Sequence, residues 1–145
     1  PTVRFYEGLS GITRVYDDIL LTANNESGTV SILTISSGKD LLKLLPGHHT
    51  QFIRKRVNRG IGVRMLAPDN QLTRRLFTSD NTALRDTRYF NEDSFPFHVE
   101  CNIYGDKTAL IGFNEPGVMA TVIENREIAN SLRSVFEMLW LGANK

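Results

Sequence analysis

The apolar pattern of this chain changes near its middle, and that change constrains the fold more than any other feature. In the first half, short apolar runs alternate with stretches whose apolar residues recur at helical spacing. From residue 97 onward, apolar runs follow one another with only short, turn-rich joints. Alternating strands and helices favour parallel pairing, whereas short joints favour an antiparallel meander. We therefore expect an α/β fold with one mixed β-sheet and helices packed on its faces.

The first half predicts three strands and four helices. The expected strands are Val3–Tyr6, Thr29–Ile35 and Ile61–Leu66, and the expected helices are Leu9–Leu21, Lys39–Leu45, His49–Arg59 and Asn70–Thr78. The turn cluster Asn24–Gly28 ends the first helix, and Gly60 stands where a C-terminal cap residue belongs. The polar segment Ser79–Pro96 has no clear period, so we expect a long loop with one short element around Arg88–Phe90.

The second half predicts three strands and a final helix. The strands are Phe97–Tyr104, Lys107–Phe113 and Val118–Ile123, and the helix is Arg126–Leu141 with Asn125 as its cap. The expected buried stripe of this helix consists of Ile128, Leu132, Val135, Phe136 and Leu139. Trp140 is interpreted as a core or interface anchor.

Length and composition indicate one domain that extends over residues 1–145. A chain of 145 residues, of which 41% are hydrophobic, can bury a real core. The formal net charge is +1, so the whole domain has no strong attraction for nucleic acid or for an acidic membrane. Cys101 is the only cysteine, which fits a reduced, cytoplasmic protein. No apolar run reaches membrane-spanning length.

A polar row lies on the expected strand Phe97–Tyr104. Successive side chains of a strand point to opposite faces of the sheet. One face would carry Phe97, Val99, Cys101 and Ile103, and the other would carry His98, Glu100, Asn102 and Tyr104. Four polar side chains in register on a strand that otherwise looks buried are unusual.

Residues 98–112 resemble the active-site strand of the phospholipase-D-like superfamily. In that superfamily the strand carries a His, a Lys two residues on, an Asp five residues after the Lys, and a later Gly. His98 and Gly112 match this pattern, whereas Glu100 stands at the Lys position and Gly105 at the Asp position. Asp106 is displaced by one residue. The resemblance implies a phospholipase-D-like half-unit whose catalytic strand serves another use.

The substitution of Glu100 for a lysine opposes phosphodiester chemistry. In the resembled enzymes a neutral His attacks phosphorus and the Lys holds the charge that grows on the phosphate. A carboxylate there reverses the sign of a unit charge, which costs several kcal/mol at an effective dielectric constant of about 20. Loss of the cation removes roughly a hundred- to a thousand-fold in rate, by analogy with a lost oxyanion donor. We therefore expect no enzymatic activity.

Several stretches along almost the whole chain resemble the effector domain of TrmB-like transcription regulators. They are Val3-Arg-Phe-Tyr-Glu-Gly8, Tyr16-Asp-Asp-Ile19, Arg85-Asp-Thr-Arg-Tyr89, Ile103-Tyr-Gly-Asp-Lys-Thr-Ala-Leu110 and Phe136-Glu-Met-Leu-Trp140. The resemblance implies a non-catalytic effector domain. It also implies a winged helix-turn-helix that precedes Pro1 in the full-length chain and contacts DNA. The effector would be a small molecule, a sugar or another metabolite.

The candidate ligand-binding residues are His98, Glu100, Asn102, Arg85 and Arg88. Carboxylate, amide and imidazole groups suit a hydroxyl-rich or cationic ligand better than phosphate. The favoured interpretation of the polar row remains a structural one: internal hydrogen bonds, or the centre of a dimer interface. We expect a homodimer, because a half-unit would bury its polar strand against a second copy. No cofactor and no metal site are expected.

Other polar motifs have structural interpretations. Arg54, Lys55, Arg56 and Arg59 are interpreted as the solvated surface of a helix. The side chains of His48 and His49 should diverge, which disfavours a shared metal. Ser36–Lys39 lacks the glycine spacing of a phosphate loop and is interpreted as a strand-to-helix turn.

Three hypotheses for function therefore stand. The first is a non-catalytic regulatory domain, effector-sensing or dimerising, of a TrmB-like transcription regulator. The second is a dimeric phospholipase-D-like phosphodiesterase or nuclease that uses His98 from each chain. The third, less favoured, is a free-standing protein-interaction domain without a small ligand.

Overall fold

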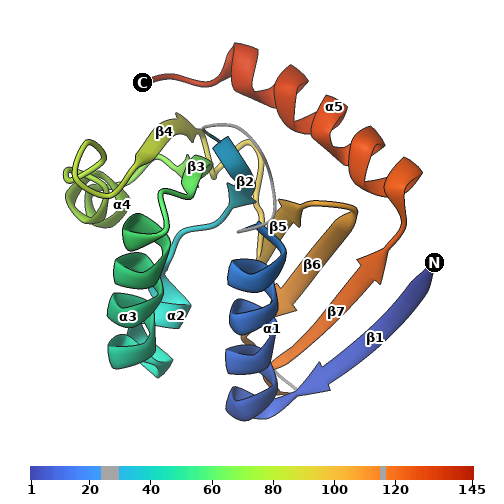
Figure 1. The fold of residues 1–145 in the computed structure, drawn as a ribbon. Helices are drawn as coiled ribbons and strands as arrows, with labels where there is room; N and C mark the ends of the chain where they lie inside the picture. Colours follow the sequence, from blue (N-terminus) through green and yellow to red (C-terminus); the bar gives the residue numbers. More distant parts are fainter. Residues whose placement is uncertain (24–29, 115–116) are drawn as a thin grey trace.

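The computed structural model describes residues 1–23, 30–114 and 117–145, and these form one mixed sheet with helices on both faces (Figure 1). The turn cluster Asn24–Gly28 lies outside the described residues. The strands are β1 (Thr2–Glu7), β2 (Val30–Ile35), β3 (Gly62–Pro68), β4 (Arg85–Phe90), β5 (Val99–Tyr104), β6 (Lys107–Gly112) and β7 (Met119–Glu124). The helices are α1 (Gly8–Ala23), α2 (Lys39–Leu44), α3 (Pro46–Asn58), α4 (Gln71–Leu76) and α5 (Arg126–Gly142).

The sheet order is β1-β7-β6-β5-β2-β3-β4. β2, β3 and β4 pair in parallel, and β5, β6 and β7 form the expected antiparallel meander. β5 joins the two halves by pairing antiparallel with β2, where Thr34 lies opposite Asn102. The prediction of parallel pairing is wrong for β1, which pairs antiparallel with β7 at the far edge. The mixed α/β fold class is confirmed.

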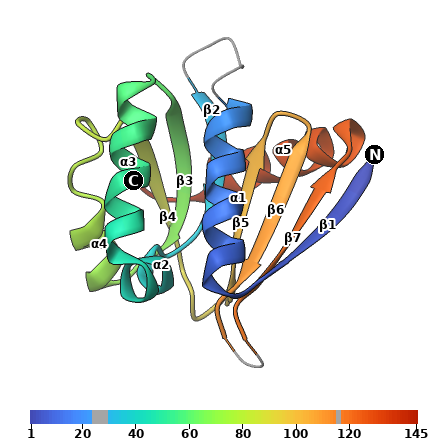
Figure 2. The same cartoon turned by 60° about the horizontal axis from the view of Figure 1, so that its bottom comes forward.

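The two faces of the sheet carry separate cores. α1 and α3 cover one face and α5 crosses the other (Figure 2). Under α1, the side chains of Ile12, Val15 and Ile19 are fully buried, as the helical stripe predicts. Leu9, at the start of that stripe, is 39% exposed. Of the helices that the structure describes, none combines the length and the apolar character needed to cross a bilayer.

The buried face of α5 differs from the predicted stripe. Phe136 and Trp140 stack with their ring centroids 5.6 Å apart and pack with Ala129 against the sheet. The predicted Ile128, Val135 and Leu139 are 41%, 42% and 49% exposed, and Leu132 is half-buried. The apolar residues of α5 cover a wider arc than one packing face, and the sheet covers only one side of the helix.

The predicted loop Ser79–Pro96 contains a strand. β4 pairs in parallel with β3, with Arg85 opposite Val63 and Phe90 opposite Pro68. The sequence of β4 is Arg-Asp-Thr-Arg-Tyr-Phe, which is too polar for a buried strand by composition alone. Two arginines of this edge strand pack on aromatic rings: the guanidinium of Arg85 lies over the ring of Phe77, and that of Arg88 lies over the ring of Trp140.

Several element ends also differ from prediction. β5 begins at Val99, where its ladder with Gly112 starts, so His98 lies in the preceding segment and is exposed. α3 begins at Pro46, a residue suited to the first helical turn because that position needs no backbone donor. The Asn125 cap is confirmed, since its Oδ1 accepts a hydrogen bond from the Ile128 amide at 2.9 Å. Gly60 has a φ of +69°, as its predicted capping position requires.

Candidate functional site

Glu100 and Asn102 of the polar row form a hydrogen-bond network with Tyr16 of α1, Thr34 of β2 and Ser36, which directly follows β2. The carboxylate of Glu100 accepts from the hydroxyl of Ser36 at 2.6 Å, from Nδ2 of Asn102 at 2.9 Å, and from the hydroxyl of Tyr16. The hydroxyl of Thr34 in turn donates to Oδ1 of Asn102 at 2.7 Å. Glu100 and Asn102 are only 6% and 4% exposed.

This network already buries the polar strand within one chain. The ring of Tyr16 packs edge-on against Phe52 of α3, with the two ring centroids 5.0 Å apart. Burial, and then the charge of Glu100, raise the pKa of Tyr16 well above its usual value, so the phenol stays a donor. The expected reason for a dimer, that a second copy must cover this strand, is therefore wrong, because α1 and α3 cover it.

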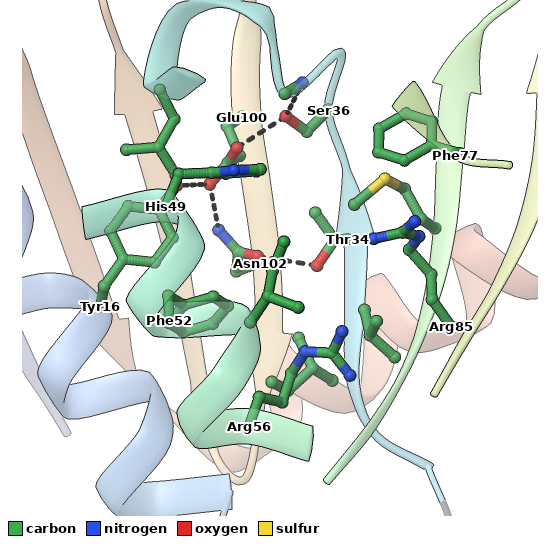
Figure 3. Close-up of a pocket in the computed structure, with 16 residues that line it drawn as sticks. Tyr16, Thr34, Ser36, His49, Phe52, Arg56, Phe77, Arg85, Glu100 and Asn102 are labelled. Atoms are coloured by element: carbon green, nitrogen blue, oxygen red, sulfur yellow. Dashed lines mark hydrogen bonds between the residues drawn. The ribbon is translucent and has the colours of Figure 1, made fainter. Parts of the chain in front are cut away.

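A small hollow, here called the inner cavity, lies between α3 and the network (Figure 3). Its volume is about 50 Å³. Its polar lining comes from Tyr16, Thr34, Ser36, His49, Arg56, Arg85, Glu100 and Asn102. Figure 3 shows the imidazole of His49 and the guanidinium of Arg85 directed into it from opposite sides.

A larger hollow, here called the outer cleft, opens beyond Glu100. Its volume is about 340 Å³. The charged residues that line it are Lys39, Asp40, Glu92, Asp93, His98 and Glu100, and the uncharged polar ones are Ser36, Ser37, Asn70, Thr73 and Asn114. Four carboxylates against one lysine and one histidine make this cleft unattractive for a phosphate.

The predicted site residues are thus only partly brought together. Glu100, Asn102 and Arg85 line the inner cavity, while His98 joins Glu100 in the outer cleft. Arg88 belongs to neither hollow: its Nη1 donates to the backbone oxygen of Trp140 at 2.8 Å, and its guanidinium lies 4.5 Å from the ring centre of Trp140. Arg85 and Arg88 are three residues apart on a strand, so they point to opposite faces.

The interpretation of Arg56 as a solvated surface residue is wrong. Its side chain is 2% exposed and donates to the backbone oxygens of Ile61 at 2.8 Å, Ala83 at 2.5 Å and Leu84 at 3.3 Å. Burial lowers the pKa of Arg56 to about 10. The sequence contains an indication of this burial, because Arg56 follows Phe52 by one helical turn and so lies on the same inward face of α3. The other polar lining residues that the sequence interpretation missed are Tyr16, Thr34, Ser36 and His49.

The remaining polar motifs have structural roles. In the Ser36–Lys39 turn, the hydroxyl of Ser36 accepts from the Gly38 amide at 2.9 Å, and that of Ser37 accepts from the Lys39 amide at 3.2 Å. His48 and His49 diverge: His48 meets the ring of Tyr16 edge-on, and His49 lines the inner cavity. Within the described ranges, no cluster of His, Cys, Asp and Glu side chains has the geometry of a metal site.

The chain matches no family model and no curated protein sequence. Its similarity is to solved structures. TrmBL2, described as an archaeal chromatin protein with a novel mode of DNA binding, has a TM-score of 0.63 at 16% identity. The match covers 100% of this chain and 54% of TrmBL2, so the chain spans about half the length of that protein.

Two other structures match over almost their whole length. Nuc from Salmonella typhimurium, a phospholipase D family member, has a TM-score of 0.65 at 16% identity and is covered over 96% of its chain. NucT from Helicobacter pylori has a TM-score of 0.62 at 11% identity and is covered over 98% of its chain. Each match covers 99% of this chain. At these identities the likeness is one of fold, and this chain has the phospholipase-D-like fold.

Proposed function

We propose that this chain is a non-catalytic regulatory domain, the effector-sensing or dimerisation part of a TrmB-like transcription regulator. The buried carboxylate of Glu100 carries the proposal. It stands where the resembled enzymes place a lysine, and three neutral donors hold it in position. A phosphate that approached His98 through the outer cleft would face this negative charge instead of a cation.

The outer cleft supports an effector role. Its volume of about 340 Å³ falls within the range of roughly 300–1,000 Å³ that small-molecule sites occupy. Hydroxyl, amide and carboxylate groups line it, and these pair well with the hydroxyl groups of a sugar or a similar metabolite. We assign His98 and Glu100 to this ligand site.

DNA contact in the full-length regulator would come from a winged helix-turn-helix that precedes Pro1. The likeness to TrmBL2 supports this part of the proposal, because about half of that DNA-binding protein lies outside the matched region. A regulator of this kind works in the cytoplasm. The sequence of the gene upstream of Pro1 tests the point directly, and the absence of such a domain there would contradict it.

We also propose a homodimer that forms through α5. The exposed apolar residues Ile128, Val135, Met138 and Leu139 recur along this helix. The spacing of seven residues between Ile128 and Val135 suits packing against another helix. In a two-fold dimer, the same stripe of a second copy is the matching surface.

The test of effector sensing is a thermal-shift screen with sugars, nucleotides and metabolites. A ligand that binds only the folded state raises the melting temperature by mass action. The shift should shrink in His98→Ala, which changes the outer cleft, and persist in Arg88→Gln, which changes the opposite face of the sheet. A screen in which no compound stabilises the protein would contradict an effector in this cleft.

A phosphodiesterase is the second candidate, because His98 and Lys39 line the same cleft. A chromogenic phosphodiester separates the two proposals. We expect the wild-type protein and His98→Ala to give the same background rate. Hydrolysis by the wild type that disappears in His98→Ala would establish the enzyme and remove the regulatory proposal.

A further inference from the structure

Arg85 has a buried donor that the fold does not use. Its Nε donates to Oδ1 of Asp80 at 2.8 Å, and its guanidinium lies 4.7 Å from the ring centre of Phe77. The side chain is only 5% exposed. Its Nη2 is buried and has no hydrogen-bond partner among the described residues. Because a buried N–H without a partner is costly, such a group in a folded protein usually serves a ligand or a water.

The end of the inner cavity near Arg85 is positively charged. Arg56 lines the same hollow, and its guanidinium is satisfied by backbone oxygens instead of a carboxylate. Asp80 is fully engaged, because its carboxylate binds Arg85 and also accepts from the amide and the hydroxyl of Thr87. Asp80 therefore balances the charge of Arg85, while the guanidinium of Arg56 is bound by backbone oxygens and not by a carboxylate among the described residues.

His49 completes this end of the cavity from the side of α3. Its imidazole points into the hollow toward Arg85 (Figure 3). Burial, and then the positive charge of Arg85, lower the pKa of His49. Glu100, the carboxylate that lines the cavity, already accepts hydrogen bonds from Tyr16, Ser36 and Asn102.

We propose that this end of the inner cavity binds a small carboxylate anion, of the size of acetate, between Nη2 of Arg85 and the imidazole of His49. A guanidinium N–H and an imidazole N–H are suitable donors for two carboxylate oxygens. The anion would balance the second guanidinium charge and satisfy the unused donor of Arg85.

The size of the cavity sets the class of ligand. A cavity needs a volume of roughly 10–15 Å³ to hold one water molecule, and the volume of the inner cavity is about 50 Å³. This leaves room for a few non-hydrogen atoms but not for a sugar or a nucleotide, whose sites typically exceed about 300 Å³. Arg85 and His49 do not line the outer cleft. The proposal of an anion site in the inner cavity therefore does not depend on the proposal of an effector site in the outer cleft.

The probe is sodium acetate, titrated at constant sodium concentration with sodium pivalate (trimethylacetate) as the replaced salt. Pivalate carries the same charge and the same carboxylate, has no hydroxyl groups for the outer cleft, and is too large for the inner cavity. We expect acetate to raise the melting temperature of the wild type by about 5 °C at ten times its Kd, and pivalate to have no such effect. A wild type that responds equally to both salts, or to neither, would overturn the proposal.

Three variants locate the site. His49→Leu removes the imidazole donor at similar volume, and Arg85→Gln removes the guanidinium; both should abolish the response to acetate. Arg88→Gln is the matched control, because Nε of Arg88 is also a buried donor without a partner among the described residues but lies on the other face of the sheet. If Arg85→Gln does not fold, the response of His49→Leu tests the proposal alone. An acetate response in His49→Leu as large as in the wild type would contradict the proposed anion site.

Discussion

The hydroxyl of Tyr16 on α1 donates a hydrogen bond to Oε2 of Glu100 on β5, across 84 residues of sequence. This bond joins the first helix to the central strand at the point where the two halves of the sheet meet. It also explains how a carboxylate that is 6% exposed stays in the core with no ion-pair partner among the residues that the structure describes. Neutral donors replace the water that the carboxylate loses on folding.

Removal of this donor should destabilise the fold. Tyr16→Phe leaves Oε2 of Glu100 with only the amide of Asn102, so we expect the free energy of unfolding to fall by about 1.5–3 kcal/mol, the usual range for a hydrogen bond to a charged group. Urea denaturation followed by circular dichroism measures the change.

Glu100→Leu and the double variant complete a thermodynamic cycle. The two single losses should not add, because each removes the same hydrogen bond. A coupling energy near zero would show that Tyr16 and Glu100 stabilise the protein independently, in contradiction to the network.

Arg56 should be intolerant of lysine although the charge is conserved. Its guanidinium reaches three backbone oxygens from a buried position, and a lysine ammonium cannot reproduce that fork. We expect Arg56→Lys to lower the free energy of unfolding by about 2 kcal/mol or more. Arg54→Lys, two residues earlier on the exposed side of α3, should change it by less than about 0.5 kcal/mol. Equal effects of the two substitutions on the free energy of unfolding would contradict a buried, structural role for Arg56.

Stability should depend on pH through His49. The pKa of His49 is lowered in the folded state by burial, by Arg85 and by His48, so the folded protein binds this proton less readily than the unfolded chain. The stability contributed by neutral His49 is therefore complete above the unfolded pKa of about 6.5 and is lost as the pH falls through the lower, folded value.

Melting temperatures between pH 5 and pH 7.5, in buffers without small carboxylates, measure this dependence. In His49→Gln the slope below about pH 6.5 should be shallower than in the wild type. Lys39→Gln leaves all three histidines in place and should keep the wild-type slope. An unchanged slope in His49→Gln would assign the pH dependence to other groups.

The α5 stripe should control self-association. Val135→Glu places a charge among the exposed apolar residues of α5 and should convert a dimer to a monomer in sedimentation velocity at high micromolar concentration. Leu44→Glu is a control of similar exposure on α2 and should remain dimeric. A wild type that sediments as a monomer at that concentration would refute the homodimer, and dimeric Val135→Glu would place its interface elsewhere.

Much of the fold could be predicted because local patterns carry it. The stripe from Ile12 to Leu20 specifies α1 at the spacing of a helix, and the alternation along Cys101–Tyr104 specifies the two faces of β5. β4 was predicted only in part, as a short element around Arg88–Phe90, because the polar start of this strand has no apolar alternation and its strand conformation comes from its ladder with β3. Pairing with a neighbour more than a dozen residues away leaves no local trace in the sequence of an edge strand.

The candidate site shows the same division. The sequence alone put Glu100 at the position where the resembled strand has a lysine, and it put Glu100 and Asn102 on one face of a strand through the period of two residues. Only the tertiary structure decided that Tyr16 and Ser36 satisfy Glu100, that Arg56 is buried, and that Arg85 and Arg88 lie on opposite faces of the sheet. Burial and hydrogen-bond partners depend on which distant segments pack together, and residue order along the chain does not encode them locally.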